Sequence, residues 1–166
     1  MDKLVIANMV AMIGCVLMVA VGFLQKKRQI LLVQCVQFGF LGASNILLGA
    51  LTGAVSGGIS ILRNLVFLRK ENTPAMKLGF VVVQVVLSLM VGIKGWIDWF
   101  PVLSTVLYTW FIDVKSEVRL KLVMIAAQVL WLVYDITYMN YVAAVFDGLT
   151  IGSNLVGILM LLHRKK

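Results

Sequence analysis

The chain has 166 residues, of which 61% are hydrophobic and 13% are charged, and its mean hydropathy is +1.01. A soluble domain of this length has too little interior to bury so much apolar surface, so this composition excludes a water-soluble enzyme or binding domain. The formal net charge is +8, but the basic residues lie in short clusters between long apolar segments. That pattern is typical of a membrane protein and argues against a nucleic-acid partner.

The first part of the chain contains three apolar segments long enough for membrane-spanning helices. They are residues 4–24, 30–45 and 51–68. A basic turn, residues 25–29, separates the first two, and the polar segment 69–74 with Pro74 ends the third. The first segment begins after only three residues and has no evident small-residue cleavage site. We therefore expect a retained helix and not a signal peptide.

The second part of the chain predicts four more helices. They are residues 78–91, 99–112, 120–135 and 141–162. The first two of these four are short for a membrane span, and the mixed-charge loop 113–119 separates them from the last two. The predicted fold class is therefore an all-α integral membrane protein with seven transmembrane helices.

The basic residues predict the orientation of these helices. If loops one, three and five share a side with the C-terminus, that side holds twelve basic residues and the other side holds only Lys3 and Lys94. The twelve are Lys26, Lys27, Arg28, Arg69, Lys70, Lys77, Lys115, Arg119, Lys121, Arg164, Lys165 and Lys166. Basic loops stay in the cytoplasm, so we expect a cytoplasmic C-terminus and an outer N-terminus.

An internal repeat appears when the sequence is shifted by 90 residues against itself. Residues 54–66 then fall on residues 144–156 with seven of thirteen positions identical, including Asn64 with Asn154. The shift superposes helices one to three on helices five to seven. This predicts a first three-helix repeat in residues 1–70, a linker with the fourth helix in 71–95, and a second repeat in 96–166. Because the linker returns the chain to its starting side, the two repeats are expected to be parallel, related by an axis along the membrane normal.

This 3+1+3 pattern resembles the SWEET and PQ-loop transporter superfamily, and within it the YgjV-type bacterial inner-membrane proteins. The resemblance in topology covers the whole chain, but the resemblance in individual residues is limited to helices three and seven. It implies a bacterial inner-membrane location and places Asn64 and Asn154 in a central pocket. Tyr138 stands sixteen residues before Asn154, where the sugar transporters carry a pocket tryptophan. The family's helix-bending prolines are also mostly missing, since Pro101 is the only proline within a predicted span.

Five polar residues within or beside the predicted spans have both a functional and a structural interpretation. Asn64 and Asn154 could bind a polar solute or join neighbouring helices by hydrogen bonds. Asp147 could bind a cation, take up a proton or pair with Arg63. Asp135 could act similarly or lie at a solvated helix end. Arg63 could line the pocket, but we favour a side chain that reaches the lipid headgroups.

We expect a carrier for a small polar metabolite. The family resemblance suggests a sugar, while Asp147 and the absent tryptophan also allow an amine. The alternative is a receptor or binding module that does not transport. No enzyme is expected, because the spans lack histidine and any set of nucleophile, base and orienting group. We expect no cofactor, metal site or disulfide, because Cys15 and Cys35 lie inside spans as small apolar side chains. The expected partners are the solute and membrane lipid, and a homo-oligomer remains open.

Overall fold

The computed structural model describes residues 2–69 and 73–163. Within these residues the chain forms seven α-helices and one short 3₁₀ turn. They are α1 (Lys3–Phe23), α2 (Lys27–Leu48), α3 (Leu51–Arg69), α4 (Pro74–Met90), η1 (Trp96–Asp98), α5 (Trp99–Phe111), α6 (Glu117–Thr137) and α7 (Tyr141–His163). The prediction of an all-helical chain with seven helices is confirmed.

Three helices begin earlier than the apolar segments predicted, and two of them begin behind a polar capping residue. Helix α4 begins at Pro74 instead of residue 78, because the side chain of Thr73 accepts a hydrogen bond from the backbone N–H of Met76 at 3.3 Å. Proline suits the first helical position, where its missing N–H costs nothing. Helix α6 begins at Glu117 behind Ser116, which caps the N–H of Arg119 at 3.4 Å, and α2 begins at Lys27.

Five of the described helices are long and apolar enough to cross a membrane: α1, α2, α3, α6 and α7. Helix α4 is apolar but has 17 residues, and α5 has 13 residues that continue from η1. A span needs about 20 residues on average. The predicted crossing is therefore supported for five helices, and for α4 and α5 it stays a prediction.

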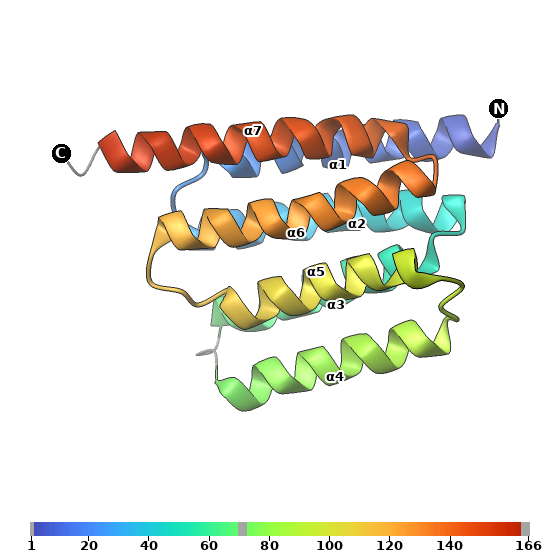
Figure 1. Cartoon of the computed structure of the whole chain (residues 1–166), viewed down its shortest axis with the longest axis horizontal. Helices are drawn as coiled ribbons and strands as arrows, with labels where there is room; N and C mark the ends of the chain where they lie inside the picture. Colours follow the sequence, from blue (N-terminus) through green and yellow to red (C-terminus); the bar gives the residue numbers. More distant parts are fainter. Residues whose placement is uncertain (1, 70–72, 164–166) are drawn as a thin grey trace.

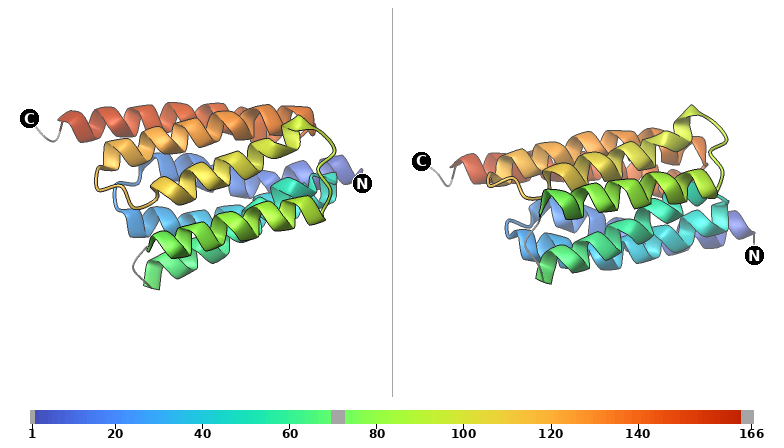
Figure 2. Two further views of the ribbon diagram at one scale, coloured as in Figure 1. Left: turned by 60° about the horizontal axis from the view of Figure 1, so that its bottom comes forward. Right: turned by 90° about the horizontal axis from the view of Figure 1, so that it is seen from below.

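The helices run side by side in two layers (Figure 1). One layer has the order α1, α2, α3 and the other has the order α7, α6, α5, with α2 and α6 in the middle of each. The layers join where α1 packs against α7 and α3 against α5, and α4 closes one edge by packing against α3 and α5 (Figure 2). In the described part of the chain, α2 and α6 face each other across the bundle without packing closely.

The bundle is apolar outside and holds many polar groups inside. Large apolar side chains such as Met90, Val145 and Ile46 are exposed, at 76%, 63% and 62%. Buried positions, in contrast, hold many amides, hydroxyls and charged groups, and Gln84 and Asn64 are fully buried. This distribution fits a protein whose solvent is lipid, because an unpaired polar group facing hydrocarbon costs several kcal/mol.

Close packing at Gly157 predicts a stability effect. A Cβ atom there would lie 2.5 Å from the carbonyl oxygen of Gly22 in α1 and 2.9 Å from the side chain of Lys121 in α6. We expect Gly157→Ala to lower the free energy of unfolding by about 1 to 3 kcal/mol, seen as a lower thermal midpoint in detergent. Gly152→Ala in the same helix is the matched control, because nothing lies within 4 Å of that position. Equal midpoints for the two variants would contradict the packing described here.

Candidate functional site

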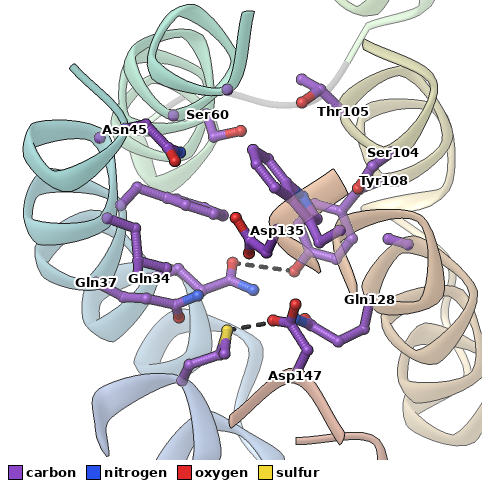
Figure 3. A pocket seen from close by; sticks show the side chains of 18 of the residues that line it. Gln34, Gln37, Asn45, Ser60, Ser104, Thr105, Tyr108, Gln128, Asp135 and Asp147 are labelled. Carbon is purple, nitrogen blue, oxygen red and sulfur yellow. Dashed lines mark hydrogen bonds between the residues drawn. The ribbon is translucent and has the colours of Figure 1, made fainter. Parts of the chain in front are cut away.

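A cavity lies between the two layers, where α2 and α6 stand apart. Its volume is about 60 Å³, which is room for a few water molecules or a small solute. Figure 3 shows side chains entering it from both layers. The polar residues that line it are Gln34, Gln37, Asn45, Ser60, Arg63, Ser104, Thr105, Tyr108, Gln128, Asp135, Asn140 and Asp147. Apolar side chains, among them Met18, Met124 and Trp131, complete the wall.

Two carboxyl groups meet in this cavity, Asp135 from α6 and Asp147 from α7. Both side chains are buried, at 4% and 1% exposure, and both line the cavity. The amide of Asn140 donates to Asp135 at 3.2 Å, and the amide of Gln128 donates to Asp147. No Lys or Arg side chain of the described residues forms an ion pair with either group. Among the described residues, the ion pair that does form joins Lys77 and Asp113. Neighbouring amides therefore hold the carboxyl pair without a counter-charge.

Several buried oxygens around the cavity have no hydrogen-bond donor. They are Oε1 of Gln37, Oδ1 of Asn45, Oδ1 of Asn140 and Oδ2 of Asp147. Their residues are at most 5% exposed. Most buried polar groups in proteins are paired, so such a cluster indicates a place for water or a ligand. All four atoms are acceptors, so each could take a hydrogen bond from a donor group of a solute.

Arg63 points into the bundle and not to the headgroups, so the preferred sequence interpretation of this residue is wrong. Its side chain is 1% exposed. Its guanidinium donates to Oδ1 of Asn64 at 2.9 and 3.1 Å and to Oγ1 of Thr109 at 3.1 Å, and it stacks on the ring of Tyr108 at 4.7 Å. These oxygens and the ring stabilise the positive charge of the guanidinium, so the side chain can be buried. The proposed pairing of Arg63 with Asp147 is not formed.

A second polar network closes the end of the bundle where α1 begins. The N–H of Gly53 donates to the Tyr134 hydroxyl at 3.0 Å, and that hydroxyl contacts Oγ1 of Thr52 at 2.9 Å. Oγ1 of Thr52 in turn donates to Asp98 at 3.4 Å, and the Tyr138 hydroxyl donates to the same carboxylate at 2.5 Å. Burial and the bond to Asp98 raise the pKa of the Tyr138 hydroxyl to about 12. The hydroxyl therefore stays protonated and keeps donating near neutral pH.

An apolar cluster closes the opposite end. It consists of Val21, Ile30, Leu31, Phe67, Tyr108, Ile112, Leu120 and Met124. These side chains come from five helices, α1, α2, α3, α5 and α6, close to where the chain enters or leaves each helix at that end. The cavity therefore lies between a polar closure at one end and an apolar closure at the other.

The structure separates the six residues that the sequence placed in the site. Asp135, Asp147 and Arg63 line the cavity. Asn64 lies behind it: its amide donates to Oε1 of Gln34 at 3.3 Å, and its oxygen accepts from Arg63. Asp135 is also buried and not at a solvated helix end.

The remaining two predicted residues lie elsewhere. The amide of Asn154 donates to the backbone oxygen of Thr150 at 2.9 Å, and its backbone adjoins Gly22 of α1. Tyr138 belongs to the network around Asp98. Neither residue lines the cavity, and their predicted contact with a solute stays a prediction.

Sequence reasoning missed most of the amides of the cavity wall. Gln34, Gln37 and Asn45 lie on one face of α2, and Gln128 lies on α6. A signal was present, because a neutral amide inside an apolar helix is costly unless it faces the interior. Asn45 also falls on Asp135 under the 90-residue shift.

The contacts of Arg63 predict that lysine cannot replace it. A lysine ammonium cannot bridge Asn64 and Thr109 while stacking on Tyr108, because it lacks the planar fork of donors. We expect Arg63→Lys to lower the free energy of unfolding by about 1 to 3 kcal/mol, measured by thermal unfolding in detergent. Arg69→Lys, at the exposed end of the same helix, should leave the midpoint unchanged. An Arg63→Lys protein as stable as wild type would argue that the guanidinium contacts are unimportant.

The family model Imp-YgjV, described as a bacterial inner membrane protein, matches residues 5–165. No curated protein and no solved structure matches the chain.

Proposed function

The chain belongs to the Imp-YgjV family of bacterial inner membrane proteins, and on this premise we propose that it is a carrier for a small polar solute. The central cavity supports this function best. Its polar wall combines side chains of both layers, and it leaves buried amide oxygens on Gln37, Asn45 and Asn140 without donors. A core with a purely structural role would be expected to pair these oxygens or to replace them with apolar groups.

We further propose that the bundle consists of two parallel three-helix repeats joined by α4, a SWEET-like arrangement. Positions 31–50 are buried, half-buried or exposed in the same order as positions 121–140. The turns that follow also agree: Gly49 and Met139 both have positive φ, at +71° and +57°. The N–H of Ala50 donates to the backbone oxygen of Asn45, as that of Asn140 does to Asp135, both at 2.9 Å. These pairs are all 90 residues apart, which supports a common ancestry of the two halves.

Transport through such a bundle requires the cavity to open to each side in turn. On one side, opening would break the polar network of Thr52, Tyr134, Tyr138 and Asp98. On the other side, it would separate the apolar cluster around Ile30 and Ile112. Both closures join helices of the two proposed repeats. A rigid-body movement of one repeat against the other would therefore break one closure while the other stays intact.

Solute flux into proteoliposomes tests the carrier. We expect uptake of at least one small polar solute from a panel of sugars, nucleosides and amines. Ser60→Leu should abolish this uptake, because Ser60 lines the cavity and a leucine side chain would fill it. Gly58→Leu places the same side chain on the same helix, but at a position with nothing within 4 Å, and should retain uptake.

The outcomes of the flux experiment separate the two functions considered for this chain. Saturable binding of a panel solute to purified protein, without flux under any gradient, would replace the carrier by a receptor on the same scaffold. Equal loss of uptake in Ser60→Leu and Gly58→Leu, with both proteins folded, would contradict a path through the cavity.

The orientation is a further part of the proposal. Figure 1 shows the α1–α2 and α5–α6 connections at the same end as the C-terminus. Eight described basic residues of the predicted cytoplasmic set support this end as cytoplasmic: Lys26, Lys27, Arg28, Arg69, Lys77, Lys115, Arg119 and Lys121. The other members of that set, Lys70, Arg164, Lys165 and Lys166, lie outside the described residues.

Reporter fusions test this orientation. Green fluorescent protein fused after residue 166 should fluoresce, because it folds in the cytoplasm, and alkaline phosphatase fused there should be inactive. The same reporters fused after Met139, in the α6–α7 turn, should give the opposite pair of results. Active phosphatase at the C-terminus would reverse the orientation.

A further inference from the structure

We propose that the cavity binds a small primary ammonium cation, with the carboxyl pair Asp135 and Asp147 as its anchor. The inference rests on the carrier function proposed for the same cavity and names its substrate class. It draws on two independent features: the charge of the carboxyl pair, and the hydrogen-bonding character of the amides around it.

The charge argument starts from two buried carboxyl groups that line the same cavity. Two carboxylates that line one small buried cavity repel each other, so such a pair takes up one proton and carries one negative charge. Neither Asp135 nor Asp147 has a basic partner among the described residues. A buried charge without a partner is costly in a membrane protein. One bound monovalent cation would neutralise the pair.

The amides around the pair indicate which cation fits. Gln37, Asn45 and Asn140 each have a buried oxygen without a donor, and none of these residues belongs to the acidic pair. Gln37 and Asn45 extend from α2 into the space that Asp135 and Asp147 enter from the other layer (Figure 3). A primary ammonium group offers three N–H donors to such acceptors. A quaternary ammonium offers none, and a neutral alcohol has no charge to offer the carboxyl pair.

The other groups that face the pair do not supply the missing charge. The thioether of Met18 lines the cavity from α1, and the amide of Gln128 in α6 donates to Asp147. The one guanidinium in the cavity wall, that of Arg63, is held by Asn64 and Thr109 and stacks on the Tyr108 ring. The Tyr108 hydroxyl donates to Gln34 at 3.2 Å and so joins the two layers.

The cavity also limits the size of the cation. A volume of about 60 Å³ holds a few water molecules, so the cation has only a few non-hydrogen atoms. Ethanolamine is a suitable probe, and ethylene glycol is its neutral counterpart of equal size. Tetramethylammonium carries the same charge as ethanolamine without an N–H donor.

Equilibrium binding to the purified full-length chain in detergent, followed by isothermal titration calorimetry, tests the inference on the wild-type protein. We expect ethanolamine to bind at least about tenfold more tightly than ethylene glycol or tetramethylammonium, the difference that one charge-assisted hydrogen bond makes. Equal affinity for ethanolamine and ethylene glycol would overturn the role of charge. Equal affinity for tetramethylammonium would overturn the role of the N–H donors.

Substitutions at the pair locate the site. Asp147→Asn and Asp135→Asn keep the shape of the side chain, and each should weaken ethanolamine binding by about tenfold or more. Asp2→Asn is the matched control: Asp2 is exposed and caps α1 through the N–H of Leu4, and asparagine caps a helix equally well. Unchanged ethanolamine affinity in both cavity variants would overturn the assignment of the site.

Flux measurements separate this inference from the carrier proposal. Ethanolamine binding that depends on Asp147, without any uptake into proteoliposomes, would support the cation site and reject the carrier. Uptake of a neutral solute that Ser60→Leu blocks, with no binding of ethanolamine, would support the carrier and reject the cation site.

Discussion

A polar group that faces lipid has no hydrogen-bond partner, and this constraint shapes the whole bundle. The outward surface consists of Leu, Val, Ile and Met side chains, and the amides and carboxyls lie inside. In a soluble protein of this size, the interior would be the apolar region and the surface would be polar. Here the polar groups gather between two layers of helices, and the cavity forms where they meet without filling the space.

Close helix contacts at the edges of the bundle leave room at its centre. Gly57 of α3 lies against Gly42 and the backbone of Phe38 in α2, so these two helices approach closely within one layer. The layers meet through α1 with α7 and through α3 with α5. Helices α2 and α6 therefore remain apart in the middle, and their amide side chains reach into the gap instead of packing against each other.

Charges of opposite sign occupy the cavity wall without neutralising each other. Arg63 is surrounded by neutral oxygens and an aromatic ring, and Asp135 and Asp147 are held by neutral amides. A direct ion pair would leave little affinity for a charged ligand, because each charge would already have its partner. The separation of these groups thus supports a site that recognises charge in a solute, while neutral partners keep each residue in place.

The sequence alone determined that this is a helical membrane protein, because segment length and composition fix what lipid can accommodate. It also located the helices to within a few residues, and it pointed to Asp135 and Asp147 because carboxyl groups inside spans are rare. Helix starts at Pro74 and Glu117 were missed, since capping side chains and not apolar runs set them.

Only the tertiary structure decided which way Arg63 points. The direction depends on the three residues that surround its guanidinium, which are Asn64, Thr109 and Tyr108. The same holds for Asn64 and Asn154, which match in sequence but meet different neighbours: Asn64 contacts Gln34, whereas Asn154 bonds within its own helix. Periodicity shows which face of a helix turns inward, but the packing of all the helices decides what each side chain finds there.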